Sequence, residues 1–305
     1  MTLTQIPFEA GDALLDWSEL ALALEQGHKL PKADIGDTFL YRGKDTLLSR
    51  AAWIDGMGVA VKSATIYPDN PAQGRPMING AVCLYADETG MLEALIDFHL
   101  VTKWKTVGDS LLAAQKLARA DSKTILIVGA GTVGRSVHAA FGPAFKDARF
   151  EIWNRTTATA QAMAADLPNL TVVTDLEDAV RRADIIVTAT MSTTPLIKGE
   201  WLQPGQHLNM IGAYRPDMRE ADDTALKRAR IFVDSYDTTI GHIGELKIPI
   251  EAGVITKSDL VADYYDMGAF KRTSEDDITL FKNGGGAHLD LMTSRYILEK
   301  WMAAA

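Results

Sequence analysis

Residues 124–135, Thr-Ile-Leu-Ile-Val-Gly-Ala-Gly-Thr-Val-Gly-Arg, restrict the folds open to this chain more than any other segment. Aliphatic and β-branched residues run into three glycines, and helix-forming sequence follows at once. A buried strand, a tight turn and a helix N-terminus together make a pyrophosphate site. A glycine-rich turn without a ligand is the alternative, but the surrounding pattern favours dinucleotide binding. The residues expected to form this loop are Gly129, Gly131, Thr132, Val133 and Gly134.

From Lys123 onwards the sequence alternates between strand and helix patterns. Helices are expected at 158–166 and 176–182, and Thr174-x-x-Glu177 fits a capping box for the second. Such alternation predicts an α/β fold with a doubly wound parallel sheet of the Rossmann type. Strands are expected at residues 124–128, 149–153, 170–174, 184–189, 207–211 and 230–233.

The front of the chain follows a different pattern. A helix is expected at 13–26, and short strands of antiparallel character follow it up to about residue 97. A helix at 100–119 would bridge the two halves, and a last helix, 289–302, would return to the first. We therefore predict a discontinuous mixed α+β domain, residues 1–115 and 287–305, beside a Rossmann domain, residues 116–286.

Composition limits the partners and the compartment. The net charge of −9 argues against nucleic acid or an anionic membrane as a partner. No apolar run is long enough to span a bilayer, and the N-terminus lacks the features of a signal peptide. Cys83 is the single cysteine, and the six histidines show no metal-ligand spacing. We expect a cytoplasmic protein without a metal site.

The end of the second Rossmann strand predicts the form of the coenzyme. An acidic residue at this place binds the ribose 2′-hydroxyl of NAD and repels a 2′-phosphate. Here Glu151 lies inside the strand, and the strand end reads Asn154-Arg155-Thr156. Arg155 can pair with a phosphate dianion, while Asn154 and Thr156 add neutral donors. The sequence therefore predicts NADP (NADPH) over NAD; a solvated surface arginine at 155 is the alternative.

Several further segments carry a family resemblance through their order and spacing. They are residues 58–62, 100–106, 127–131, 153–156, 184–190, 204–213, 215–220, 233–234 and 281–282. Over nearly the whole chain this set resembles the ornithine cyclodeaminase/mu-crystallin family, and Trp153-Asn-Arg-Thr156 is similar to its NADP-binding ketimine reductases. The resemblance implies a homodimer whose N-terminal domains join sheets. It also implies an active site between that substrate-binding and dimerisation domain and the NADP-binding Rossmann domain.

Members of the family hold the carboxylate of an amino or imino acid with basic residues. Lys62 matches the family's lysine, and its place inside an apolar strand favours a function, because an unpaired buried ammonium group is costly. Lys105 stands where most members have arginine, which keeps the charge but loses the bidentate geometry. Arg50 is the expected third cation, with Lys32 as the alternative. A solvated or structural role is the competing interpretation for Lys105 and Arg50.

The loop after the fifth Rossmann strand bears on the reaction. True cyclodeaminases have an aspartate where this chain has Tyr214, and a phenol with a pKa of about 10 cannot replace a carboxylate at neutral pH. Ornithine cyclodeamination is therefore not expected. Tyr214 and Asp234 are expected to line the substrate pocket at the carboxyl edge of the sheet. Thr190, Met191 and Ser192 are expected to flank the coenzyme, with an ordinary strand-end loop as the alternative.

The resemblance thus implies an NAD(P)-dependent oxidoreductase. The expected reaction is NADPH-dependent reduction of an α-imino acid, such as 1-pyrroline-2-carboxylate or 1-piperideine-2-carboxylate. An amino-acid dehydrogenase or acyclic imine reductase, of the alanine or iminosuccinate type, is the alternative; a dicarboxylate would need a further cation from Arg42, Arg75 or Arg215. A non-catalytic NADP-binding protein is the third possibility.

Overall fold

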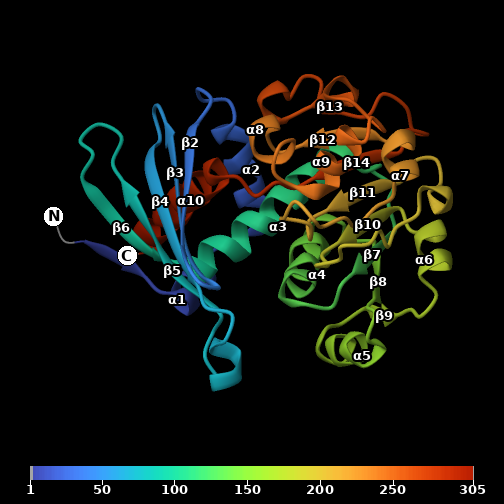
Figure 1. The fold of residues 1–305 in the computed structure, drawn as a ribbon, viewed down its shortest axis with the longest axis horizontal. Helices are drawn as coiled ribbons and strands as arrows, with labels where there is room; N and C mark the ends of the chain where they lie inside the picture. Colours follow the sequence, from blue (N-terminus) through green and yellow to red (C-terminus); the bar gives the residue numbers. More distant parts are fainter. Residues whose placement is uncertain (1–2, 305) are drawn as a thin grey trace. The chain divides into compact units, whose positions relative to one another are not determined.

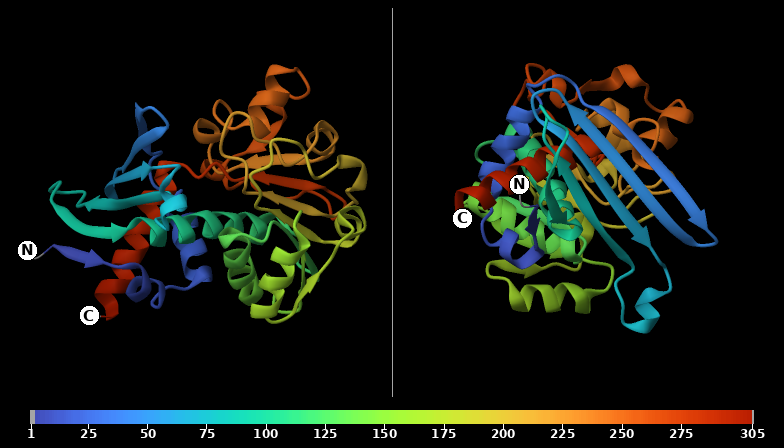
Figure 2. Two further views of the ribbon diagram at one scale, coloured as in Figure 1. Left: turned by 60° about the horizontal axis from the view of Figure 1, so that its bottom comes forward. Right: turned by 90° about the vertical axis from the view of Figure 1, so that its left-hand side faces the viewer.

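The structure is a computed structural model that describes residues 3–304. It contains two compact units (Figures 1 and 2): the first unit comprises residues 1–108 and 285–305, and the second comprises 109–284. Helix α3 (Phe98–Leu117) carries the chain from the first unit into the second, and the chain returns at Gly284–Gly285. Within residues 3–304, no helix has the length and apolar character needed to cross a membrane.

The second unit contains an eight-stranded sheet in which all neighbouring strands are parallel. Its order is β13-β12-β14-β11-β10-β7-β8-β9. The strands are β7 (Thr124–Val128), β8 (Arg149–Trp153), β9 (Leu170–Val172), β10 (Ile185–Thr188), β11 (His207–Met210), β12 (Arg230–Val233), β13 (Leu260–Ala262) and β14 (Thr279–Lys282). The predicted α/β class with a Rossmann-type parallel sheet is confirmed. The strands β13 and β14 were not predicted, and β14 lies between β11 and β12.

Helices cover both faces of this sheet, with α4 on one face and α6 and α7 on the other (Figure 1). Every residue of β7 and β10 is buried, as expected for strands covered on both faces. The helices are α4 (Thr132–Ala144), α5 (Thr157–Asp166), α6 (Leu176–Arg182), α7 (Asp223–Arg228), α8 (Tyr236–Thr239) and α9 (Gly244–Glu251), with short 3₁₀ turns at Gly199–Trp201, Lys257–Asp259 and Tyr264–Asp266.

The capping box predicted at Thr174 and Glu177 is wrong. The N-cap of α6 is Asp175, whose carboxylate accepts a hydrogen bond from the backbone N–H of Asp178 at 3.0 Å. An aspartate one residue further along satisfies the same free N–H groups and adds a negative charge at the helix N-terminus.

The direction of the chain reverses beside β7. The chain runs from β7 to β8 and β9 on one side, and then crosses to β10, which pairs with β7 on the other side. In open parallel sheets, ligands bind outside the carboxyl ends of the strands at such a switch point. The turns after Val128 and Thr188 are therefore the place to look for a coenzyme site.

The first unit contains a six-stranded sheet of order β1-β6-β5-β4-β3-β2. β1 pairs with β6 in parallel, and the other pairs are antiparallel. The strands are β1 (Thr4–Ile6), β2 (Asp34–Arg42), β3 (Asp45–Ile54), β4 (Gly58–Ile66), β5 (Ile78–Tyr85) and β6 (Leu92–Asp97); the helices are α1 (Phe8–Asp12), α2 (Trp17–Gly27) and α10 (Ala287–Ala304), with a 3₁₀ turn at Asn70–Gln73. The right view of Figure 2 shows β2–β5 side by side, with α10 (red) along the sheet.

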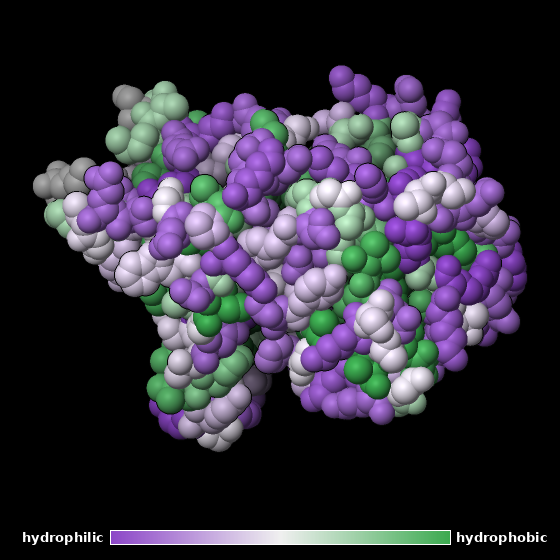
Figure 3. Space-filling view, turned by 90° about the horizontal axis from the view of Figure 1, so that it is seen from above, coloured by the Kyte–Doolittle hydropathy of each residue, from purple (hydrophilic) through white to green (hydrophobic). Residues whose placement is uncertain are grey.

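Helix α10 is the C-terminal element and packs against β3, β4 and α2. Its first three turns are buried and contain polar side chains, among them His288 and Asp290. Buried charged groups need partners, so this helix marks a polar site inside the first unit. At one edge of the sheet, all nine residues of β2 are exposed, including Phe39, Leu40 and Tyr41. By contrast, the face of the molecule drawn in Figure 3 is mostly hydrophilic, with apolar residues in scattered patches.

Candidate active site

The predicted pyrophosphate loop joins β7 to α4. Gly129 has φ +118°, a conformation that disfavours other residues, and its N–H donates to the carbonyl oxygen of Trp153 at 2.9 Å. Gly131 is the N-cap of α4 and has no side chain with which to cap the first N–H groups of this helix. A Cβ atom on Gly134 would collide with the carbonyl oxygen of Gly129, whereas one on Gly131 would meet no atom within 4 Å. The space beside Gly131 and the uncapped helix N-terminus fit a pyrophosphate.

Asn154 connects this loop to the end of β8. Its side-chain oxygen accepts from the N–H of Ala130 at 3.1 Å, and its amide donates to the carbonyl oxygen of Thr156 at 3.0 Å. Thr156 is the N-cap of α5, and Arg155 is exposed between the two. Within residues 3–304, Arg155 forms no ion pair. Its guanidinium group therefore has its donors available for an anion at the strand end.

The carboxylate of Glu220 joins the turns that follow β10 and β11 at the switch point. This residue was not predicted as part of the site from the sequence. One oxygen of its buried carboxylate accepts from both the N–H and the hydroxyl of Thr190, each at 2.7 Å. The other accepts from the hydroxyl of Thr188 at 2.8 Å and the N–H of Gly212 at 2.7 Å. A carboxylate is an acceptor-only group, so it satisfies all these donors together. Glu220 therefore fixes the loop that begins at Thr190.

The remaining residues predicted for the site differ in exposure and in hydrogen bonding. Met191 has 73% of its surface exposed, and the hydroxyl of Ser192 donates locally to the carbonyl oxygen of Thr194 at 2.6 Å. Tyr214 is 61% exposed in the loop after β11. Asp234 is fully buried and accepts from the N–H of Ser235 at 2.7 Å, so its carboxylate stabilises the turn after β12.

Two further buried ionisable side chains, Glu245 and Lys282, interact with Glu220. Glu245 accepts hydrogen bonds from the N–H groups of Glu220 and Ala221, at 2.7 and 3.1 Å. Burial and the neighbouring charge of Glu220 raise the pKa of Glu245 to about 7. Lys282 donates to the carbonyl oxygen of Met210 at 3.0 Å, and burial lowers its pKa although nearby carboxylates oppose this effect.

The three cations predicted for the carboxylate lie together in the first unit. Arg50 on β3 and Lys62 on β4 are directly opposite each other across the antiparallel ladder, so their side chains share one face. The ammonium group of Lys62 donates to the hydroxyl of Thr102 at 2.8 Å and to Asp290 at 2.9 Å. Lys105 on α3 donates to the same Asp290 carboxylate at 3.2 Å. We call Arg50, Lys62 and Lys105 the cation cluster.

Backbone and carboxylate oxygens complete the surroundings of the cation cluster. The carbonyl oxygen of Gly285 accepts from Lys105 at 2.7 Å and from Arg50 at 3.0 Å. Arg50 also pairs with Asp37, with an N–O distance of 2.6 Å. Sequence reasoning missed Asp290 as a member of this site. The burial of this aspartate is visible only in the structure, so the sequence offered no signal for it.

Burial and the neighbouring charges together shift the pKa values of the groups in and around the cluster. Desolvation lowers the pKa of Lys105 to about 7, although Asp290 opposes this effect. Desolvation also lowers the pKa of Lys62, again against Asp290. Burial by itself would raise the pKa of Asp290, but the charges of Lys105, Lys62 and Arg50 outweigh it and hold the pKa at about 2. Three cations face two carboxylates, Asp290 and Asp37, and the excess positive charge attracts an anion.

The other cations named from the sequence lie elsewhere. Lys32 and Arg75 are exposed. Arg42 pairs with Asp45 and Arg215 with Asp217, each at 2.9 Å. In the part of the chain that the structure describes, no group of His, Cys, Asp and Glu side chains is arranged to hold a metal ion.

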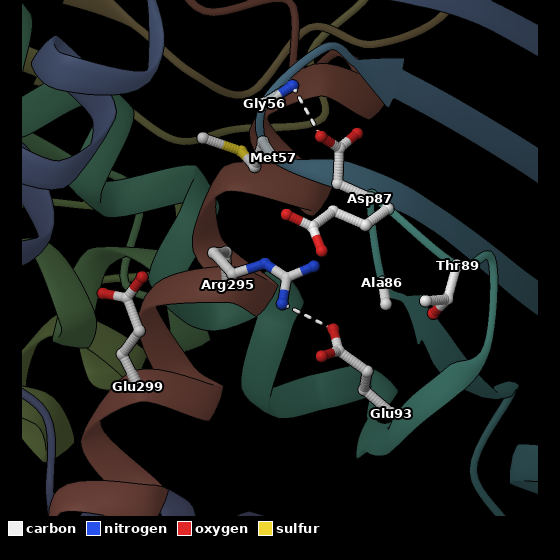
Figure 4. Close-up of a pocket in the computed structure, with 9 residues that line it drawn as sticks. Gly56, Met57, Ala86, Asp87, Thr89, Glu93, Arg295 and Glu299 are labelled. Atoms are coloured by element: carbon white, nitrogen blue, oxygen red, sulfur yellow. Dashed lines mark hydrogen bonds and ion pairs between the residues drawn. The ribbon is translucent and has the colours of Figure 1, made fainter.

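A separate hollow in the first unit contains none of the predicted residues (Figure 4). Arg295 donates to Glu93 across it at 2.6 Å, and Asp87 accepts from the N–H of Gly56 at 3.0 Å. These ion pairs and hydrogen bonds stabilise the turns between the strands. The residues around the hollow are Gly56, Met57, Ala86, Asp87, Glu88, Thr89, Glu93, Arg295 and Glu299.

The fold is that of an α/β protein of the dinucleotide-binding type. It combines a parallel sheet and its glycine turn with a discontinuous mixed unit that contains the cation cluster. The chain belongs to the ornithine cyclodeaminase/mu-crystallin family, whose profile matches residues 52–305. The family predicted from the sequence is thereby confirmed.

Three similar proteins illustrate this membership. Delta(1)-pyrroline-2-carboxylate reductase of Paracoccus denitrificans (strain Pd 1222) is 47% identical over 297 residues, which cover 94% of each chain. The structure of Thermococcus litoralis Delta(1)-pyrroline-2-carboxylate reductase in complex with NADH and L-proline has a TM-score of 0.89 and 25% identity, and covers 99% of this chain and 98% of that one. An archaeal alanine dehydrogenase dimer with bound NAD has a TM-score of 0.90 and 27% identity, with coverage of 100% and 97%. The prediction of an oxidoreductase is confirmed by these relatives.

Proposed function

We propose that the protein is an NADPH-dependent reductase of a cyclic α-imino acid, such as 1-pyrroline-2-carboxylate or 1-piperideine-2-carboxylate. The observation that carries the proposal is the cation cluster, in which Lys62 and Lys105 are buried and Arg50 is half-buried, with its excess positive charge. The relative at 47% identity is named for the first of these substrates, which supports the choice.

In this proposal the cation cluster binds and orients the substrate carboxylate. Lys62 and Lys105 are held by Asp290, so their ammonium groups need little reordering when an acid binds. The dihydronicotinamide, when bound, supplies the hydride that reduces the imine carbon. A protonated imine accepts hydride without a strong acid, and the product is a neutral amine. Lys62 or a water molecule is proposed to supply the proton that the amine nitrogen then takes up. Of the two substrate contacts predicted in the second unit, Tyr214 is exposed and Asp234 is fully buried, so Tyr214 is the one proposed to contact the substrate.

The coenzyme is proposed to bind along the turns of the second unit. The backbone around Gly129, Gly131 and Gly134, with Thr132 and Val133 in the first turn of α4, would hold the pyrophosphate. The loop of Thr190, Met191 and Ser192 would lie against the nicotinamide end.

Asn154, Arg155 and Thr156 are proposed to bind the 2′-phosphate of NADPH. The exposed guanidinium group of Arg155 supports this choice, because it suits a phosphate dianion. The two solved relatives described above contain NADH and NAD, so the ratio of kcat/KM for NADPH to that for NADH is the measurement that decides this point. A ratio below one would refute the NADPH assignment and leave the reductase intact.

We also propose a homodimer, in which β2 pairs with a second copy of the chain. β2 is an edge strand with three exposed apolar side chains, Phe39 and Tyr41 on one face and Leu40 on the other, which a partner strand would help to cover. The archaeal relative is a dimer. A change of Leu40→Glu should produce monomers in light scattering, whereas a dimer that persists in this variant would contradict the interface.

The proposed location is the cytoplasm, in keeping with a single cysteine.

An assay with two substrates tests the function. We expect oxidation of NADPH with 1-pyrroline-2-carboxylate to be much faster than with pyruvate plus ammonia. The second reaction is the rival, since an alanine dehydrogenase is among the solved relatives. Faster turnover with pyruvate plus ammonia would favour the rival, and tight coenzyme binding without turnover of either would favour a non-catalytic binding protein.

A further inference from the structure

Asp290 occupies the centre of the cation cluster. One of its oxygens lies 2.9 Å from the ammonium group of Lys62 and 3.1 Å from that of Lys105. The exposed fractions of these three side chains are 2%, 7% and 6%. Two ammonium groups that share one oxygen atom lie close to each other, and without a carboxylate between them they would repel strongly in a buried place.

Helix α10 is suited to supply this carboxylate. Asp290 lies in its first turn, where the positive end of the helix favours a negative charge. The titratable groups that act on Lys105 lie on three elements: Asp290 and His288 on α10, Lys62 on β4, and Arg50 on β3. Asp290 is the negative group among these, so the charge state of the lysines depends on it.

We propose that Asp290 is a positioning residue that keeps the ammonium groups of Lys62 and Lys105 together and charged, as a receptor for a single carboxylate. The inference rests on the proposed function and narrows its substrate class to acids that carry a single carboxylate. Two lysines and one aspartate carry a net charge of +1, which one carboxylate neutralises. A second carboxylate would add an uncompensated negative charge, and Arg50 already pairs with Asp37.

The same helix offers a matched control. Lys103, also on α3, pairs with Asp12 at 2.6 Å, but these side chains are 24% and 28% exposed. Asp12→Asn removes a comparable charge from a lysine outside the cluster. Asp290→Asn removes the charge inside it with almost no change of shape.

The experiment measures the affinity of the full-length protein, with NADPH present, for pyrrole-2-carboxylate between pH 5.5 and 8.5. This planar acid carries one carboxylate and cannot be reduced as an imine. Wild type and Asp12→Asn should lose affinity with a midpoint near pH 7, where Lys105 loses its proton. In Asp290→Asn the midpoint should fall by at least about one pH unit, because the attraction that keeps the proton on Lys105 is gone. A uniform loss of affinity with an unchanged midpoint would overturn the proposal.

Two further measurements complete the test. Asp290→Glu retains the charge, so its midpoint should stay near that of wild type. A midpoint at least about one pH unit below that of wild type would contradict the inference, and this comparison stands even if Asp290→Asn fails to fold. Pyrrole-2,5-dicarboxylate should bind wild type at least about 10-fold more weakly than pyrrole-2-carboxylate. Equal binding, or no binding of either acid, would overturn the single-carboxylate receptor. Failure of imine turnover in wild type, with these binding results intact, would instead refute the proposed function.

Discussion

Oε1 of Glu220 accepts two hydrogen bonds from Thr190, one from the backbone N–H and one from the hydroxyl, each at 2.7 Å. The other oxygen reaches the N–H of Gly212, so one carboxylate joins the turns after β10 and β11. A glutamine would place an NH₂ group against these donors. We expect Glu220→Gln to lose about 2–4 kcal/mol of unfolding free energy and to bind NADPH at least about 10-fold more weakly.

Denaturant unfolding and a coenzyme titration check this prediction. Glu177→Gln is the control, because Glu177 forms an exposed pair with Arg181 and its loss should change stability by less than about 0.5 kcal/mol. Wild-type stability and coenzyme affinity in Glu220→Gln would show that the hydrogen bonds of Glu220 are dispensable.

Lys62→Met should reduce kcat/KM for the imino acid by about 10²–10³-fold. The reason is that the variant removes an ammonium group that the proposal assigns to the substrate carboxylate, while Lys105 still pairs with Asp290. Steady-state kinetics provide the measurement, with Lys103→Met on α3 as the control. Near-normal imine turnover in Lys62→Met would refute the role of this lysine.

Arg155→Ala should raise KM for NADPH by about 10–100-fold and change KM for NADH by less than about 3-fold. The difference arises because the guanidinium group would contact a phosphate that NADH lacks. Arg149→Ala is the control, since Arg149 is exposed at the opposite end of the same strand β8. Equal losses with both coenzymes would point to a structural role for Arg155.

Substitution by alanine should have a different effect at each of three glycines, one at the N-cap of α4 and two within the helix. Gly131→Ala should weaken coenzyme binding without a loss of stability, because its Cβ enters space that the pyrophosphate is proposed to occupy. Gly134→Ala should destabilise the fold by about 1–3 kcal/mol, because its Cβ collides with the carbonyl oxygen of Gly129. Gly142→Ala, in open space on the same helix, should stabilise it by up to about 1 kcal/mol.

Thermal unfolding and a coenzyme titration of these three variants distinguish the cases. Unchanged binding in Gly131→Ala would argue against a pyrophosphate beside this residue.

The buried imidazole of His207 should make the free energy of unfolding depend on pH. Burial, with a contribution from Arg272, lowers its pKa from 6.5 to about 3. The unfolded chain therefore binds a proton below pH 6.5 that the folded chain does not, so this contribution to stability is complete above pH 6.5 and is lost as the pH falls towards 3. The loss amounts to about 2 kcal/mol between pH 6.5 and 5.

We expect His207→Gln to make the slope of unfolding free energy against pH shallower by about one proton in this range. His242→Gln, at an exposed position, should leave the slope unchanged. Denaturant unfolding at several pH values measures both, and equal slopes in His207→Gln and wild type would contradict the prediction.

The parallel sheet could be predicted because its strands are apolar and lie between helices. The bounds expected for β7, β8 and β12 are those observed, since these strands are buried runs with clear ends. β14 was missed because four residues after an acidic turn carry no periodicity. It lies between two strands that are closer to each other in sequence, which local patterns cannot reveal.

The cation cluster could be predicted in part. Lys62 stood out as a charge in an apolar strand, and the structure places Lys105 and Arg50 beside it. Asp290 gave no such signal, because its partner Lys62 is 228 residues away in sequence and only the tertiary fold joins them. Glu220 was not singled out either, because its partners Thr188 and Thr190 are about 30 residues away in sequence and only the fold brings them together. The roles of these residues in catalysis stay predictions until the variants are measured.

The carbonyl oxygen of Gly285, which receives hydrogen bonds from Arg50 and Lys105, belongs to the residue where the backbone re-enters the first unit. Lys105 itself lies shortly before Gly108, where the backbone leaves that unit. Both passages of the polypeptide are thus anchored to the groups proposed to receive the acid. An acid that accepts hydrogen bonds from Lys105 and Arg50 would therefore compete with the carbonyl oxygen of Gly285 for the same N–H donors.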